Sequence, residues 1–145
     1  MPRTVEIAIL VLAACLSGCA TRVLAPTPNG RSAGGLEISE GLATYYGEEF
    51  HRKTTASGVR FDMNALVAAH PSYPFGTVIR VTNLANGRST NVRILDRGPA
   101  PQQRAEGIII DLSRKAAEVL GFIQRGRARV RLEVLEWGRP IKRLD

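Results

Sequence analysis

The 145-residue sequence has few cysteines and no apolar run long enough to cross a membrane. Its only cysteines, Cys15 and Cys19, lie near the N-terminus. Residues 20–145 can therefore form no disulfide among themselves, no zinc–thiolate site and no cysteine nucleophile. The N-terminal apolar run, residues 5–16, is shorter than the ~20 residues that a transmembrane helix needs. Internal repeats and low-complexity tracts are also absent, which excludes a repeat array.

Positive charge exceeds negative charge: 20 Lys and Arg against 13 Asp and Glu give a net charge of +7 and a pI near 10.2. This balance favours a polyanionic partner or a membrane surface. The length fits one domain. Hydrophobic residues make up 44% of the chain, close to the average of globular proteins, which argues against wholesale disorder.

The N-terminus has the pattern of an export signal. A single Glu interrupts the apolar run of residues 5–16, which leads into small residues, as in a secretory signal peptide. The sequence Leu16-Ser17-Gly18-Cys19 resembles a bacterial lipobox, which implies that Cys19 is lipidated and opens the mature protein. The alternative is a buried N-terminal helix, but no capping residue begins the run. We therefore expect a signal peptide in residues 1–18 and a lipid-anchored protein of the cell envelope, facing the periplasm or cell wall.

The segment after the anchor differs in composition from the rest of the chain. Residues 19–40 carry two prolines and three glycines with little periodicity, which predicts a flexible linker. Residues 41–137 form the expected folded domain, and residues 138–145 form a C-terminal tail.

Short apolar and β-branched segments predict six strands and one short helix. Residues 128–136 alternate between apolar and charged side chains, and Asn86-Gly87 favours a hairpin turn. Ser113 can cap the start of the helix and Gly121 can end it. This content predicts a small, mainly β barrel. The expected strands are 41–46, 65–70, 77–82, 90–95, 108–110 and 128–136, and the expected helix is 113–120.

Nine short segments form a recognisable pattern between residues 41 and 136. They are Ala43-Thr-Tyr-Tyr-Gly47, Phe50-His-Arg-Lys53, Thr55-Ala-Ser-Gly58, Phe61-Asp-Met-Asn-Ala65, Ala68-Ala-His70, Pro74-Phe-Gly-Thr77, Val81-Thr-Asn-Leu84, Asp96-Arg-Gly-Pro99 and Ile110-Asp-Leu-Ser113. This pattern resembles the rare lipoprotein A family of bacterial septal-ring lytic transglycosylases. The resemblance implies a six-stranded double-psi β-barrel.

The same resemblance implies a function. Such enzymes are expected to cut the β-1,4 bond between N-acetylmuramic acid and N-acetylglucosamine, favouring glycan strands without stem peptides, and to leave 1,6-anhydro ends. Neither a metal nor an organic cofactor is implied. The implied partners are peptidoglycan glycan strands, the membrane through the lipid anchor, and division proteins. Nucleic acid is not expected, because the chain is exported and no binding motif is present.

Two residues match the catalytic positions of the family, Asp96 and His70. A single carboxyl can serve first as general acid and then as general base, which is the role implied for Asp96. His70 would hydrogen-bond to the acid or the sugar, with a change of charge near neutral pH. The alternatives are a turn-forming Asp and a core or rim histidine. Asp111 is a candidate second carboxylate, with helix capping beside Ser113 as its alternative.

Further residues are candidates for a substrate groove. Tyr45 and Tyr46 alternate along a strand, so only one can face a given side, for sugar stacking or for the core. Basic side chains can bind muramoyl carboxylates or form a solvated surface. The groove candidates are Tyr45, Tyr46, Thr55, Ser57 and Arg97, and the basic residues are Arg52, Lys53, Arg60, Arg88, Arg93 and Arg97.

One position departs from the family pattern. Val59 follows Thr55-Ala-Ser-Gly58, where the family usually has a Glu that belongs to the catalytic apparatus. A valine can neither move a proton nor stabilise a developing positive charge. The alternative function is therefore a peptidoglycan-binding or division-associated lipoprotein with weakened or absent turnover.

Overall fold

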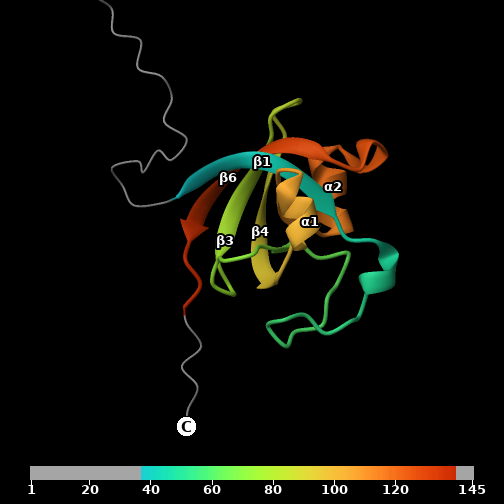
Figure 1. The fold of residues 1–145 in the computed structure, drawn as a ribbon, viewed down its shortest axis with the longest axis vertical. Helices are drawn as coiled ribbons and strands as arrows, with labels where there is room; N and C mark the ends of the chain where they lie inside the picture. The colour runs from blue at the N-terminus through green and yellow to red at the C-terminus, as the bar shows by residue number, and fades with distance from the viewer. Residues whose placement is uncertain (1–36, 140–145) are drawn as a thin grey trace, which may run out of the picture.

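Six strands close into a barrel in the computed structural model, which describes residues 37–139 (Figure 1). The order around the barrel is β1-β5-β2-β4-β3-β6. The β1–β5 and β2–β4 pairs are parallel, and the other four are antiparallel. The small-barrel prediction is thus confirmed. The strands are β1 Ile38–Tyr45, β2 Val67–Ala69, β3 Val78–Asn83, β4 Ser89–Asp96, β5 Ile108–Leu112 and β6 Ala128–Glu136.

The barrel interior is filled by the inward-facing residues of the strands. In β6 the side chains of Val130, Leu132 and Val134 are buried, whereas Arg129 and Arg131 are exposed. This is the alternation that the sequence predicted. Burial of each such aliphatic side chain contributes about 1.5–3 kcal/mol of transfer free energy. The other fully buried large residues are Phe122, Ile79, Ile94, Ile110, Leu112, Leu120, Val81 and Val92.

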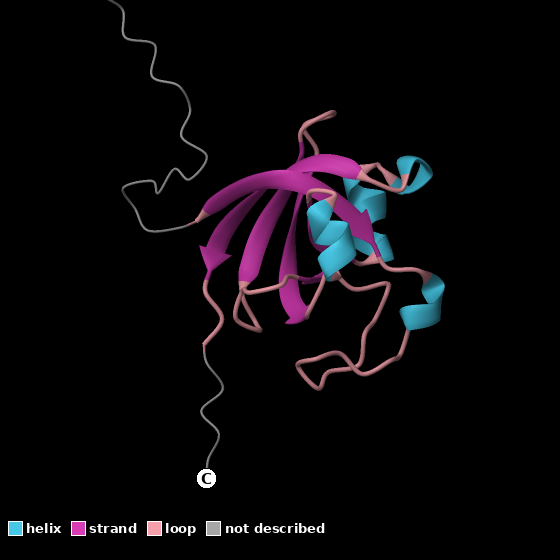
Figure 2. Ribbon diagram, in the orientation of Figure 1, coloured by secondary structure: helices cyan, strands magenta, loops and turns pink. Residues whose placement is uncertain are grey.

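Two short helices lie on the side of the barrel away from the ends of the described chain (Figure 2). The predicted helix is α2, Arg114–Leu120. The Ser113 hydroxyl accepts a hydrogen bond from the Ala116 N–H at 3.2 Å, and Gly121 ends the helix in the left-handed region with φ 75°. The sequence pattern missed α1, Pro101–Ala105, because five residues carry no helical periodicity. Single 3₁₀ turns lie at η1, Glu48–Phe50, and η2, Ile123–Arg125.

The first strand begins earlier than predicted. Residues Ile38, Ser39 and Glu40, which we assigned to the linker, pair with β6 in the antiparallel ladder. Gly41 looked like a boundary because glycine usually ends a regular element. Instead it lies within β1, where an added Cβ would come within 2.7 Å of the Ile109 side chain. The glycine serves close packing against β5 rather than a turn.

The C-terminal boundary also moves slightly. Gly138, assigned to the tail, donates its N–H to the Thr77 hydroxyl at 2.9 Å, and Trp137 packs edge-on against Tyr73. Predictions for the signal peptide, Cys19, most of the linker and residues 140–145 lie outside the described residues. Within residues 37–139, no helix is long and apolar enough to cross a membrane.

The long β1–β2 loop, residues 46–66, carries much of the recognised pattern. It projects from one end of the barrel (Figure 2). The loop is tied together by a bridge between Thr54 and Arg60, and by paired backbone bonds in which Arg52 donates to Phe61 and Phe61 donates to Lys53, both at 2.8 Å. It is also tied to the barrel, because the Ser57 N–H donates to the Leu95 carbonyl at 3.2 Å. The loop is therefore held against the end of β4.

Candidate functional site

Two carboxylates flank the same residue of β2. Ala69 pairs with Asp96 of β4 on one side and with Asp111 of β5 on the other. Asp96 is the last residue of its strand, while Asp111 precedes the last residue of β5. Residues 15 apart in sequence thus come to lie on either side of one strand. This pair is the centre of the candidate active site.

The Asp96 carboxylate is oriented by three donors. Its Oδ1 accepts hydrogen bonds from the Ala56 and Arg97 N–H groups, both at 2.8 Å, and its Oδ2 accepts from the Tyr46 hydroxyl at 3.2 Å. The Ala56 bond spans 40 residues and joins the β1–β2 loop to β4. The alternative of a carboxylate that bonds only its own turn therefore does not describe Asp96.

Asp111 is buried, with 7% of its surface exposed. Its carboxylate accepts a hydrogen bond from the hydroxyl of Thr44, its register partner on β1. Burial raises the pKa of Asp111, the Thr44 bond lowers it, and the negative charge of Asp96 raises it again. The net direction is upward, so this carboxyl holds its proton to higher pH than an ordinary aspartic acid. Helix capping, the alternative for Asp111, is done by Ser113 itself.

Gly98 closes the space between the carboxylates and Tyr46. An added Cβ there would lie 3.1 Å from Asp111 Oδ2 and 3.5 Å from the Tyr46 hydroxyl, and the glycine has φ 153°. Any side chain at this position would press into the site, which explains the glycine of the Asp96-Arg97-Gly98 turn.

Tyr46 connects the carboxylates to an aromatic cluster. Burial raises its pKa, and the negative charges of Asp96 and Asp111 raise it further, so the hydroxyl stays protonated and donates. The Tyr46 ring lies 5.1 Å from the Phe50 ring and 4.9 Å from the Phe61 ring, centroid to centroid. Phe50 is 39% exposed. It therefore offers an accessible aromatic surface beside the carboxylates.

Tyr45 points elsewhere, which corrects its assignment to the groove. Its hydroxyl donates to the Ile123 carbonyl at 3.3 Å, and its ring packs edge-on against Phe122. Successive strand residues face opposite sides, so the placement of Tyr46 beside Asp96 sends Tyr45 toward the hydrophobic core.

Arg97 lies next to Asp96 in sequence but directs its charge away from that carboxylate. Its guanidinium donates to the carbonyls of His70 at 3.2 Å and Tyr73 at 2.9 Å. It also lies over the Phe75 ring, 3.8 Å from the centroid. Arg97 therefore fastens the segment after β2 to the site and neutralises neither carboxylate by direct contact.

His70 is a buried, neutral histidine. Its Nδ1 accepts from the N–H groups of Ser72 at 3.3 Å and Tyr73 at 3.1 Å, and its ring stacks on Tyr73 at 3.6 Å. Burial lowers its pKa to about 4, with a further contribution from Arg97. The expected change of charge near neutral pH is therefore wrong. Because Nδ1 accepts, the ring proton lies on Nε2, which is a donor.

Thr55 and Ser57 shape the loop over Asp96. The Thr55 hydroxyl lies 2.7 Å from the Val59 carbonyl, to which it donates, and 2.9 Å from the Ser57 hydroxyl. Thr55 is buried, and its backbone N–H also donates to the Val59 carbonyl. These bonds hold the turn that aims the Ala56 N–H at Asp96. The Val59 side chain is 49% exposed, so its role in the turn is carried by the backbone.

Sequence reasoning missed two contributors, Thr44 and the aromatic pair of Phe50 and Phe61. Thr44 has no motif signal, because its contact with Asp111 depends on strand pairing across 67 residues. Both phenylalanines lie in the quoted pattern, but their packing on Tyr46 depends on the path of the loop. Residues 37–139 hold no group of three or more His, Cys, Asp or Glu arranged to bind a metal ion.

Comparisons with curated proteins give close relatives over the barrel. A protein named endolytic peptidoglycan transglycosylase RlpA from Campylobacter jejuni is 46% identical over 102 residues, 70% of this chain and 36% of that protein. A probable endolytic peptidoglycan transglycosylase RlpA from Nostoc sp. is 51% identical over 108 residues, 72% of this chain and 28% of that protein. The chain thus spans about a third of the length of these relatives.

Solved structures share the fold. Streptomyces papain inhibitor aligns with a TM-score of 0.51 at 23% identity, over 67% of this chain and 94% of its own. An expansin of Clavibacter michiganensis aligns with a TM-score of 0.54 at 20% identity, over 71% of this chain and 52% of its own. Together with the topology, these likenesses confirm the double-psi β-barrel. The profile of the family described as lytic transglycolase matches residues 38–132, from the first strand to the middle of the last, and the chain belongs to that family.

Proposed function

We propose that the barrel is a peptidoglycan lytic transglycosylase that cuts glycan strands endolytically and leaves 1,6-anhydro ends. The observation that carries the proposal is the Asp96–Asp111 pair beside Ala69, in which one carboxyl has a raised pKa. Membership of the family and the names of the relatives support the same activity. The proposed substrate is glycan strands without stem peptides. The bond that is cut is the one between N-acetylmuramic acid and N-acetylglucosamine.

The reaction needs one proton donor and then one acceptor. As the bond from the muramoyl C1 to the bridging oxygen breaks, that oxygen takes a proton. The C6 hydroxyl of the same sugar then bonds to C1 and gives up its proton. One carboxyl can do both, because donation leaves it as a base. No water has to be positioned, and the proton count returns to its starting state.

The different environments of the two carboxyls support different roles for them. Asp111 is buried with a raised pKa, which suits the acid that becomes the base. Asp96 is held by three donors on the other side of Ala69, and in this proposal its negative charge stabilises the positive charge that develops on the sugar. We therefore propose Asp111 as the general acid and base, the role that the sequence had suggested for Asp96. Asp96 takes the supporting role that had been expected for Asp111. His70 donates from Nε2 to a sugar oxygen as a neutral group.

The test measures cleavage of glycan strands from which the stem peptides have been removed. The native chain should release 1,6-anhydro products from denuded strands, detected by mass spectrometry. Asp111→Asn should reduce the rate by about 10²–10⁴-fold, because general acid–base catalysis is removed. Circular dichroism checks the fold of the variant. Equal product release by a folded Asp111→Asn chain contradicts the assignment of Asp111.

Val59 favours a second candidate, a glycan-binding barrel with little or no turnover. Its side chain is exposed on the turn that bonds Asp96, so Val59→Glu should cost little stability and place a carboxylate near the site. If the barrel is an enzyme, this variant should be faster than the native chain. Glycan binding without anhydro products, both in the native chain and in folded Val59→Glu, would leave the binding module as the function.

The cell envelope is the proposed location, since peptidoglycan is the proposed substrate. Residues 1–18 are the proposed lipoprotein signal peptide, Cys19 is the proposed lipid anchor, and residues 20–36 are the proposed linker. Division proteins are proposed partners.

A further inference from the structure

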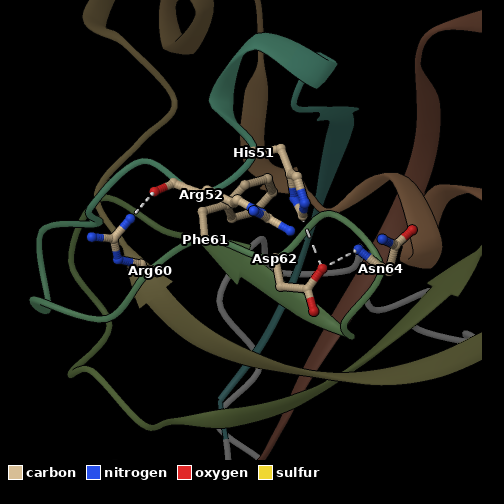
Figure 3. Close-up of a pocket in the computed structure, with 6 residues that line it drawn as sticks. All are labelled: His51, Arg52, Arg60, Phe61, Asp62 and Asn64. Atoms are coloured by element: carbon tan, nitrogen blue, oxygen red, sulfur yellow. Dashed lines mark hydrogen bonds and ion pairs between the residues drawn. The ribbon is translucent and has the colours of Figure 1, made fainter.

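A pocket of about 340 Å³ opens in the β1–β2 loop, apart from the two carboxylates (Figure 3). It is lined by His51, Arg52, Arg60, Phe61, Asp62 and Asn64. The lining is predominantly polar, and two of its six side chains are guanidinium groups. Phe61 links this lining to the site described above, because its ring packs on that of Tyr46.

Arg52 is held in an unfavourable backbone conformation at this pocket. It has φ 66°, and no other residue than glycine has a positive φ in residues 37–139. An L-residue in the left-handed region is strained relative to glycine. The conformation is fixed by the Arg52 N–H, which donates to the Phe61 carbonyl, and the Arg52 carbonyl accepts from the Arg60 guanidinium at 3.4 Å. The strain therefore places a large cationic side chain where glycine would fit more easily.

The charges of the pocket are not balanced internally. Within residues 37–139, neither Arg52 nor Arg60 has a carboxylate within ion-pair distance. Asp62 accepts a hydrogen bond from the Asn64 N–H at 2.9 Å and lies 3.9 Å from His51. His51 Nδ1 accepts a hydrogen bond from the Met63 N–H at 3.2 Å. The Arg60 guanidinium lies against the Arg52 carbonyl, away from Asp62, whereas the Arg52 side chain extends on the side of His51 and Asp62 (Figure 3).

Such a lining matches a sugar acid. Planar guanidinium groups bind carboxylates through paired hydrogen bonds. The free oxygen of Asp62 and the amide of Asn64 can bond the hydroxyl or N-acetyl groups of the same ligand. In peptidoglycan without stem peptides, the lactyl group of every muramic acid carries a free carboxylate. An intact stem peptide would convert that group to a neutral amide.

The pocket adjoins the candidate active site through one side chain. Phe61 lines the pocket and also packs on Tyr46, whose hydroxyl bonds Asp96. The same turn that carries Arg60 carries the Ala56 N–H that bonds Asp96. One glycan strand can therefore lie along both, with one sugar at the carboxylates and another at the pocket.

We propose that this pocket is a subsite for the free lactyl carboxylate of a muramoyl residue, with Arg52 as its cationic ligand. The inference rests on the proposed function for the identity of the polymer. It makes the β1–β2 loop the part of the protein that distinguishes stripped strands from peptide-bearing ones.

The experiment measures binding by isothermal titration calorimetry to denuded strands and to the same strands with methyl-esterified lactyl groups. The full chain carrying Asp111→Asn prevents cleavage during the titration. We expect about five- to tenfold tighter binding of the free acid, because solvent screening weakens the charge-assisted hydrogen bonds of the guanidinium in an open pocket. Arg52→Gln should abolish this preference.

The matched control is Arg125→Gln, which removes one charge from an exposed position in η2. It should keep the preference for the free acid. Equal binding of the acid and the ester, or an equal loss in the control, would overturn the subsite. Product release by the native chain is scored separately. Acid preference without anhydro products rejects the proposed enzyme and keeps the subsite, whereas products without acid preference reject the subsite alone.

Discussion

At the scale of single residues, the most informative contact is the one between Thr44 and Asp111. The hydrogen bond from Thr44 lowers the pKa of Asp111, against burial and the charge of Asp96, which raise it. The threonine therefore limits how far the acid is shifted. It also fixes which carboxylate oxygen is occupied, which leaves the other oxygen, Oδ2, on the side of Gly98.

We expect Thr44→Val to move the pH dependence of cleavage. Without the bond the pKa of Asp111 rises further. Activity that needs protonated Asp111 is lost as pH rises through this pKa, so the alkaline limb should shift to higher pH. The measurement is kcat/KM for anhydro product release across pH. Thr90→Val, on the same barrel but outside the site, is the control, and an unmoved limb in Thr44→Val contradicts the role of Asp111 as acid.

At the scale of elements, β1 joins the start of the domain to the strand that carries Asp111. Its first half pairs with β6, and its second half pairs with β5 beside Asp111. The sequence predicted β6 with the right bounds, because nine alternating residues give a clear signal. It missed the first three residues of β1, because glycines and prolines dominated the preceding segment and pairing partners cannot be read from local composition.

A deletion series tests where the domain begins. A chain starting at Leu36 should unfold cooperatively, like residues 20–145. A chain starting at Gly41 loses the pairing of residues 38–40 and the bonds made by Glu37, which receives donors from Val134 N–H and the Tyr73 hydroxyl. At roughly 1 kcal/mol for each net hydrogen bond, we expect a loss of about 2–3 kcal/mol and a Tm lower by about 10 °C. Identical thermal transitions for the two chains would return the boundary to Gly41.

The loop between β1 and β2 shows where sequence reasoning ends. The motif Thr55-Ala-Ser-Gly58 can be recognised in the sequence, but its structural role cannot be predicted from it. The loop acts through a backbone N–H, that of Ala56, and no side-chain pattern encodes such a donor. Likewise, the strained Arg52 is an ordinary basic residue in the sequence, and only its φ of 66° distinguishes it from the solvated arginines.

At the scale of the whole molecule, the fold was accessible from the sequence because family segments run through nearly all of the barrel. The pairing that sets the chemistry was not. Asp96, Asp111 and Tyr46 were each identified, but their relative protonation depends on burial and on mutual charge. From the sequence alone we expect an ordinary imidazole pKa for His70. No residue pattern around it indicates that two backbone N–H groups donate to Nδ1.

Global stability should depend on pH through His70. Its folded-state pKa of about 4 lies below its ordinary 6.5. The stability that this group contributes is fully present above pH 6.5 and is lost as pH falls toward 4, by about 2–3 kcal/mol. In His70→Asn, the amide oxygen can accept in place of Nδ1 and does not titrate. Urea unfolding at pH 7 and 4.5 should show that the native chain loses more of its free energy of unfolding at the lower pH than His70→Asn does. The titration of Asp111 changes the stability of both chains alike. Equal losses would contradict a neutral, buried His70.

Attachment to the membrane is tested on the 145-residue chain with its N-terminal segment in place. Cys19→Ala should give unprocessed or unlipidated protein, because the proposed acyl chains have no other attachment point in the mature sequence. Several acyl chains anchor a protein stably, whereas one binds marginally. Mass spectrometry of membrane and soluble fractions reads out both processing and lipidation. A variant that stays membrane-bound with the same processed mass excludes the lipobox.

The position of Ala69 between the two aspartates has a consequence for how such a site varies. Neighbouring strands lie about 4.8 Å apart, so the backbone spacing of Asp96 and Asp111 equals two ladder steps, whatever fills the barrel. Changes of core side chains alter stability but leave this interval intact. Changes in the β1–β2 loop alter the side chains and backbone donors that lie beside the two aspartates. Strand pairing therefore sets the distance between the two aspartates, whereas the β1–β2 loop sets which groups surround them.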